Sequence, residues 1–142
     1  MMKRPPQSIL GVTLLEIMLV LAIAAMVIVM SIRYYQSASL NQKIAATLNN
    51  ITAIVAAGES YLAATGDMTA VSSTTLNPYL PGNTMPYSGW GGQMSVTGGS
   101  ANSYSISIPS VPTGACTQLT NLVKQNSKLS IDSGCASVTV TE

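Results

Sequence analysis

The stretch GVTLLE, residues 11–16, begins an apolar run that continues to residue 32 and dominates the sequence. From residue 17 to residue 30 the run contains only Ile, Leu, Val, Met and Ala. The 21 residues from 12 to 32 would form a helix about 31 Å long, enough to cross the hydrocarbon core of a bilayer. One ionisable side chain, Glu16, interrupts the run, and a carboxylate in a span costs roughly 2.5–3.5 kcal/mol on insertion scales. We therefore expect Glu16 to have a function and a cationic partner.

A cut in the chain would create that partner. Cleavage after Gly11 would leave Val12 as the new N-terminus, with an α-amino cation four residues before Glu16. In a helical array of subunits, Glu16 of one copy would neutralise the amine of its neighbour, and paired buried charges cost much less than single ones. Residues 1–11 would then be a leader whose two basic residues keep it on the cytoplasmic side.

These features resemble the processing site of type IV prepilins, in which a short basic leader ends in Gly and the fifth mature residue is Glu. The resemblance covers about the first 65 residues in sequence and the remainder only in layout. Many family members begin the mature chain with Phe or Met, whereas Val-Thr-Leu-Leu-Glu suits the type IVb branch. The resemblance implies cleavage between Gly11 and Val12, N-methylation of Val12, and a role for Glu16 in filament assembly.

Two other interpretations of the apolar run stay open. Ala22-Ile23-Ala24 fits the A-x-A site of a secretory signal peptide, although eight further apolar-run residues follow it and signal peptides are cut after the apolar segment. An uncleaved signal anchor is the second alternative. Arg33 and the two tyrosines that follow it mark the outer membrane–water boundary, where a cation and aromatic rings are favoured.

The composition favours an exported protein that associates with itself. Charged residues make up only 8% of the chain, and without the leader's two cations there are four basic and five acidic side chains. This balance gives no electrostatic basis for nucleic-acid binding, and a surface with few charges is poorly protected against self-association. The chain has no His, and its acidic residues outside the run are scattered. We therefore expect no enzyme activity, no metal site and no cofactor.

Cys116 and Cys135 lie outside the apolar run. An even number of cysteines in an exported chain predicts a disulfide, which would stabilise the fold by about 3 kcal/mol in the chain-entropy model. Two reduced thiols in the core are the alternative.

The first helix should continue beyond the membrane, because neither Gly nor Pro interrupts residues 12–57. It should end at a glycine stop near Gly66. An apolar stripe on its second half predicts packing on a sheet, with a coiled-coil seam as the alternative; the stripe comprises Leu40, Ile44, Leu48, Ile51, Val55, Gly58 and Leu62. Residues 67–92 should form a long connection without regular helix. Four aromatic or apolar side chains should hold it against the rest of the protein, like pins: Tyr79, Leu80, Tyr87 and Trp90.

The remaining segments predict an antiparallel sheet and a second, short helix. Residues 93–97 and 104–108 alternate apolar and polar side chains and read as a hairpin, with its core-facing side formed by Met94, Val96, Tyr104, Ile106 and Ile108. Residues 113–125 fit an amphipathic helix capped by Thr113, with Cys116, Leu119, Leu122 and Val123 on its apolar side. Residues 128–131 and 136–141 read as two more strands. The fold class is α+β: a long N-terminal helix packed on an antiparallel sheet, with the short helix in a disulfide-bounded region, a layout that also resembles type IVb pilins.

These observations give an expected organisation: residues 1–11 as leader, 12–32 as transmembrane and filament-core helix, and 33–142 as a periplasmic or extracellular globular domain. We expect a structural subunit that waits in the bacterial inner membrane and then polymerises into an extracellular type IVb pilus. The resemblance implies a prepilin peptidase, an assembly ATPase and a platform protein as partners. A minor pilin, a type II secretion pseudopilin and a monomeric membrane-tethered binding module are the alternatives. Major pseudopilins commonly carry a calcium site near the C-terminus, for which Asp132 and Glu142 are poor ligands.

Overall fold

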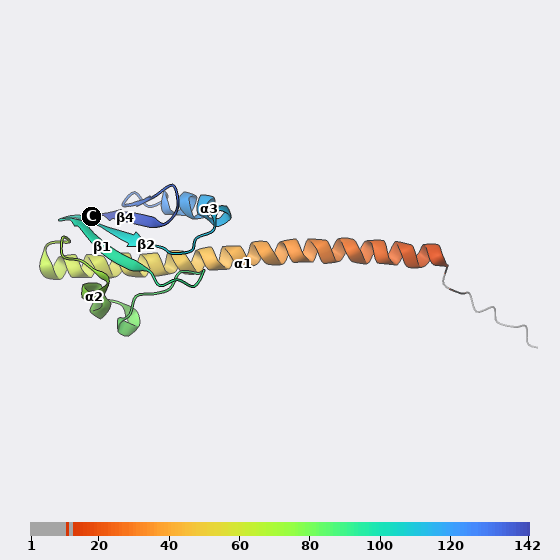
Figure 1. The fold of residues 1–142 in the computed structure, drawn as a ribbon, viewed down its shortest axis with the longest axis horizontal. Helices are drawn as coiled ribbons and strands as arrows, with labels where there is room; N and C mark the ends of the chain where they lie inside the picture. The colour runs from red at the N-terminus through yellow and green to blue at the C-terminus, as the bar shows by residue number, and fades with distance from the viewer. Residues whose placement is uncertain (1–10, 12) are drawn as a thin grey trace, which may run out of the picture. The chain divides into compact units, whose positions relative to one another are not determined.

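The computed structural model describes residue 11 and residues 13–142. It divides into two compact units, one ending at Ala38 and one covering Ser39–Glu142. Helix α1, Leu14–Thr65, contributes to both units (Figure 1). It ends at the predicted stop: Gly66 has φ +77° and its N–H donates to the carbonyl of Leu62 at 2.7 Å. This left-handed conformation is one that glycine adopts without steric cost.

The part of α1 after Ser39 packs on the sheet, as expected, but its buried face is turned from the predicted stripe. Four of the seven stripe residues are only half-buried and pack at the side of the core: Leu40, Leu48, Val55 and Leu62. The buried face comprises Ile44, Thr47, Ile51, Ile54, Ala57, Gly58 and Tyr61. Thr47 is fully buried because its hydroxyl donates to the carbonyl of Lys43 at 2.9 Å, which satisfies its polar group inside the helix.

The sheet has four antiparallel strands in the order β1-β2-β4-β3. Strand β1 is Ser95–Ser100, β2 is Ser103–Ser107, β3 is Leu129–Ile131 and β4 is Ser137–Thr141. The hairpin of β1 and β2 is therefore confirmed, although its turn is shorter than the loop expected over residues 98–103. The two glycines at residues 98 and 99 lie inside β1, where an irregularity in the register accommodates them.

The two faces of the sheet have opposite chemistry. One face contributes the core, and all five predicted core-facing residues of the hairpin region are buried there. The other face carries only hydroxyl side chains, since the register aligns Ser95, Thr97, Ser105, Ser107, Ser130, Ser137, Thr139 and Thr141 across the strands. This strict alternation is why the strand predictions succeeded.

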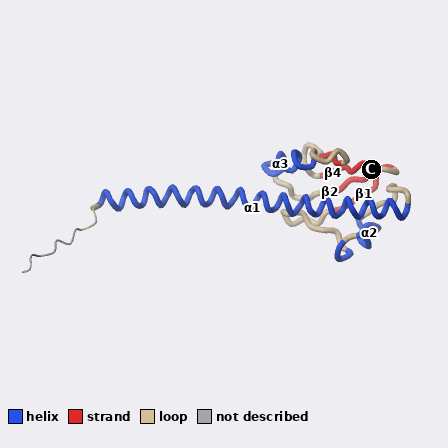
Figure 2. The backbone as a smooth tube through the Cα atoms, turned by 180° about the vertical axis from the view of Figure 1, so that it is seen from behind, coloured by secondary structure: helices blue, strands red, loops and turns tan. Residues whose placement is uncertain are grey.

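The connection from residue 67 to the sheet is more structured than expected. It contains a short helix, α2, Ser73–Leu76 (Figure 2). The helix begins with a capping box between Ser72 and Thr75. Two 3₁₀ turns follow at Asn77–Tyr79 and Pro81–Asn83. The prediction of no regular helix was therefore wrong, because α2 fits entirely before the first proline of the segment.

Three of the four predicted aromatic or apolar residues hold this connection. Leu80 is buried, Trp90 packs against the core, and the ring of Tyr79, although 40% exposed, packs edge-on against the buried ring of Tyr61 in α1 with the centroids 5.9 Å apart. Tyr87 is 60% exposed. The other buried apolar side chains of the connection are Met68, Val71, Leu76 and Met85. The turn at Gly89 also contacts α1 closely: its N–H donates to the Thr47 hydroxyl at 2.9 Å, and a Cβ at Gly89 would lie 2.9 Å from the carbonyl carbon of Lys43.

Helix α3, Thr113–Val123, lies where the short second helix was expected. Its N-cap is Pro112 and no side chain caps it, so the assignment of Thr113 as cap was wrong; Thr113 is the first helical residue. The helix buries Ala115, Leu119 and Val123 in the common core, while Leu122 is 40% exposed. The apolar side of α3 was thus only partly predicted.

Gly58 lies where α1 meets Tyr104, and we expect Gly58→Ala to lower the free energy of unfolding by about 1–2 kcal/mol. A Cβ at this position would come 2.8 Å from Cζ of the buried Tyr104 ring, so the ring or the helix must shift. Overpacking of this kind costs about 1–3 kcal/mol, which exceeds the gain of up to about 1 kcal/mol in helix propensity. Urea unfolding of the full chain in detergent micelles measures the difference.

Gly114 in α3 is the matched control, because a Cβ there meets no atom within 4 Å. Gly114→Ala should be neutral or stabilising. An equal effect of the two substitutions would contradict the proposed contact between Gly58 and Tyr104.

Candidate assembly site

The first unit consists of helix surface without a core. Every described residue up to Ala38 is exposed, including large apolar side chains on all sides of the helix, such as Leu14 at 76% and Met30 at 70%. Helix α1 is long and apolar enough to cross a membrane. A helix that is apolar all round needs lipid or other protein around it, because exposed apolar patches of this extent mark interaction surfaces.

Glu16 lies in the first turn of α1, where the structure reveals a local partner. The N–H of Glu16 donates to the carbonyl of Thr13 at 3.0 Å and to its hydroxyl at 3.3 Å, and the N–H of Ile17 donates to the same carbonyl at 3.2 Å. Thr13 therefore caps the helix. A carboxylate in the first turn also interacts favourably with the helix dipole. The role of Thr13 was not predicted, although the Thr-x-x-Glu spacing is the signature of a capping box.

The predicted cleavage site stays a prediction. Gly11 is exposed, and Val12, the expected N-methylated residue, lies outside the described residues. No described contact joins Glu16 to a cation within the chain. The cationic partner of Glu16 therefore stays a prediction as well.

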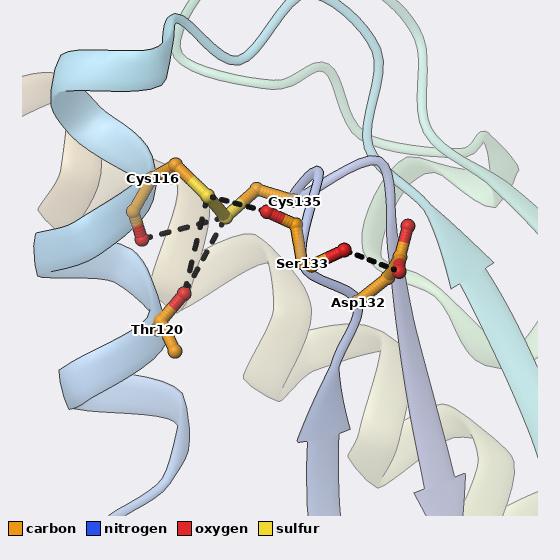
Figure 3. Close-up of a disulfide and its surroundings, with 5 residues drawn as sticks. All are labelled: Cys116, Thr120, Asp132, Ser133 and Cys135. Atoms are coloured by element: carbon orange, nitrogen blue, oxygen red, sulfur yellow. Dashed lines mark hydrogen bonds between the residues drawn. A yellow bond between two sulfur atoms is a disulfide. The ribbon is translucent and has the colours of Figure 1, made fainter.

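The two cysteines come together as expected. Cys116 of α3 is bonded to Cys135 in the turn before β4, with their Cα atoms 5.6 Å apart (Figure 3). The Thr120 hydroxyl faces the bond from one helical turn further along α3 and lies 3.4 Å from Sγ of Cys135 and 4.0 Å from Sγ of Cys116. Cys135 has φ +53°, and its N–H closes the turn by donating to the carbonyl of Asp132 at 2.9 Å. The disulfide thus fixes α3 to the start of β4.

A charged cluster at the far end of β4 ties the C-terminus to α1. Lys128 Nζ donates to Glu142 at 2.6 Å and lies 3.5 Å from Glu59 of α1. The hydrogen bond and charge of Glu142 raise the pKa of Lys128 above its ordinary value. Burial, and then the negative charges of Glu142 and Glu59, raise the pKa of Tyr104. Lys128 thus pairs with both carboxylates and connects the C-terminus to α1.

The described residues hold no group of three or more His, Cys, Asp or Glu side chains that could bind a metal ion. Asp67 lies two residues after the end of α1 and stabilises the turn that follows. Its carboxylate accepts from the backbone N–H of Thr69 at 2.8 Å and from the Thr69 hydroxyl at 2.7 Å, which lowers the pKa of Asp67.

The model of the family described as PilS N terminal matches residues 35–141, which include all of the second unit except its last residue and leave residues up to Tyr34 outside. No curated protein and no solved structure matches the chain.

Proposed function

The chain belongs to the PilS N-terminal family, which is related to the type IV pilins, and from this premise we propose that it is a structural subunit of a type IVb pilus. The observation that carries the proposal is the exposed, all-round apolar surface of α1 up to Ala38, with a single carboxylate in its first turn. A separately packed unit, Ser39–Glu142, follows this surface. A subunit that is first stored in lipid and then packed among its copies needs both features.

In this proposal residues 1–11 are removed as a leader, residues 12–32 anchor the precursor in the bacterial inner membrane, and residues 33–142 form the globular domain outside it. During assembly the apolar helix exchanges lipid for neighbouring helices. Because both surroundings are apolar, the net hydrophobic gain is small. The pairing of Glu16 with the Val12 amine of a neighbour then sets the register of the array. A prepilin peptidase, an assembly ATPase and a platform protein are the partners this route requires.

The mature N-terminus tests the proposal. We expect filaments sheared from cells to contain a chain that begins at Val12 and is heavier than the unmodified chain by one methyl group. Intact mass and N-terminal sequencing of the sheared material measure both. A chain beginning at Met1 would support an uncleaved anchor instead, and one beginning at Ala25 would support ordinary signal cleavage. A correctly processed chain present only in trace amounts relative to another subunit would indicate a minor pilin.

A further inference from the structure

A cleft lies beside β1, between the start of the strand and the segment that contains α2. It has a volume of about 260 Å³, and its polar lining consists of Ser73, Asn77, Thr84, Gln93 and Ser95. Two buried methionines, Met85 and Met94, complete the lining. No charged side chain lines this cleft. The ligand that fits it is therefore small, polar and uncharged.

Several of these polar groups have unused hydrogen-bonding capacity. The oxygen of Ser73 accepts from the N–H of Val96 at 2.9 Å, so the Ser73 hydroxyl hydrogen is free to donate. Gln93 Nε2 donates to the carbonyl of Met85 at 3.3 Å, which leaves Gln93 Oε1 as an acceptor. Asn77 Oδ1 is buried and has no partner among the described residues. A buried acceptor without a partner costs about 1–3 kcal/mol, and a donor on a ligand would offset that cost.

A second hollow adjoins the cleft. It has a volume of about 210 Å³ and shares Thr84 and Met85 with the cleft, while Pro81, Pro86 and Tyr87 give it an apolar and aromatic wall. The Tyr87 side chain is 60% exposed, yet Asn50 Nδ2 holds its backbone by donating to the Tyr87 carbonyl at 2.7 Å. The ring is thus presented to solvent from a fixed backbone position.

We propose that the two hollows together bind a neutral sugar, with one ring in the polar cleft and a second ring against Tyr87. Sugar hydroxyls both donate and accept hydrogen bonds, as the lining groups of the cleft do. An anion would find no cation in the lining, and an apolar ligand would leave Asn77 Oδ1 without a partner and the spare capacity of Ser73 and Gln93 unused. The apolar C–H face of a sugar ring suits the exposed ring of Tyr87. This binding does not depend on polymerisation of the subunit.

Methionine methyl groups provide the readout on the full chain. The protein is labelled with ¹³C-methyl methionine and held in dodecylphosphocholine micelles, because a maltoside detergent would itself offer a sugar. The probes are methyl β-D-galactopyranoside, methyl α-D-mannopyranoside, N-acetylglucosamine and the disaccharide lactose. At least one should shift the signals of Met85 and Met94 saturably and leave that of Met68, which is buried outside both hollows, unchanged. No saturable shift with any of these sugars would overturn the proposal.

Variants localise the binding. Thr84→Val and Ser95→Ala remove hydroxyls that have no hydrogen bond among the described residues, so the fold should be unaffected. Each should weaken binding about threefold to tenfold, the value of one hydrogen bond. Ser107→Ala is the matched control, because Ser107 pairs with Ser95 across the strands but lies outside the cleft. Equal binding by all three variants would overturn the assignment.

The second hollow and a competing ligand class are tested in the same way. Tyr87→Ala should weaken the binding of lactose at least threefold more than that of the monosaccharides, since only the second ring reaches Tyr87. Equal losses would contradict the two-ring arrangement. A peptide segment also carries neutral donors and acceptors, so N-acetylglycine methylamide is titrated alongside. Shifts of Met85 and Met94 with this amide and with no sugar would assign the cleft to peptide and overturn the proposal.

Discussion

Cells whose only copy carries Glu16→Ala should yield at least tenfold less subunit in sheared filaments, while cleaved subunit accumulates in the membrane at the wild-type level or above. The substitution makes the span more hydrophobic, so insertion is not impaired. In the proposed filament it would remove the counter-charge of the Val12 amine. Removing one partner of a buried ion pair costs about 3–5 kcal/mol, enough to abolish incorporation. Immunoblots of membranes and of sheared material, compared as a ratio, measure the effect.

The cap at the start of α1 provides the control for this experiment. Thr13→Val removes the hydroxyl that accepts from the N–H of Glu16 but leaves the carboxylate in place. If charge pairing is the essential role, Glu16→Gln should fail like Glu16→Ala, whereas Thr13→Val should assemble. If helix capping is the essential role, Thr13→Val should fail as well. Normal filaments from both Glu16 variants would exclude Glu16 as the assembly partner of the N-terminus and leave the uncleaved anchor as the explanation.

Local patterns predicted the parts of the fold that depend on neighbouring residues. Strict alternation identified the core-facing side chains of the hairpin, and Gly66 identified the end of α1. The buried face of α1 was predicted less well: Ile44, Ile51 and Gly58 of the stripe are buried, but the other buried residues of α1 lie outside it, namely Thr47, Ile54, Ala57 and Tyr61. Which side of the helix is turned to the sheet depends on tertiary packing, which the periodicity of the helix alone does not specify. The position of β4 between β2 and β3 likewise follows from tertiary packing.

Some of the candidate site residues could likewise be predicted from local sequence, and others could not. A sequence motif is sufficient to propose Gly11, Val12 and Glu16, and the Thr-x-x-Glu spacing was a usable signal for Thr13. The cleft beside β1 could not be predicted, because its lining comes from separate segments between residues 73 and 95 and consists of common polar residue types. Only their arrangement in the folded chain brings unused donors and acceptors together.

The small number of charged residues in the chain is reflected in the outward face of the sheet. The outward face of the sheet presents hydroxyls alone, so this face is polar enough to remain in water but offers no like-charge repulsion between copies. Such a surface suits a subunit that must pack beside many identical neighbours. It is also compatible with recognition of neutral ligands at the edge of the same sheet, where Ser95 belongs to both the hydroxyl face and the cleft.

Loss of the disulfide should have the second large effect, on stability. We expect the double variant Cys116→Ser, Cys135→Ser to lower the free energy of unfolding by about 3 kcal/mol, because the bond restricts the unfolded chain between α3 and β4. Urea unfolding of the full chain in micelles, followed through its single tryptophan, Trp90, measures this change. Wild-type protein treated with a reductant should unfold at the same urea concentration as the double variant. Membrane insertion should be unchanged, since both cysteines lie in the second unit.

The conformation of Cys135 allows a sharper test of how the bond acts. Its φ of +53° is in the left-handed region, which costs a non-glycine residue about 1 kcal/mol or more. If the turn keeps this conformation without the bond, Cys116→Ser combined with Cys135→Gly should be about 1 kcal/mol more stable than the double serine variant, because glycine adopts it freely. If the two variants are equally stable, the turn relaxes when the bond is absent, and the disulfide itself imposes the conformation. Free alkylation of both thiols in wild-type filaments, or a double serine variant as stable as wild type, would contradict the stabilising role altogether.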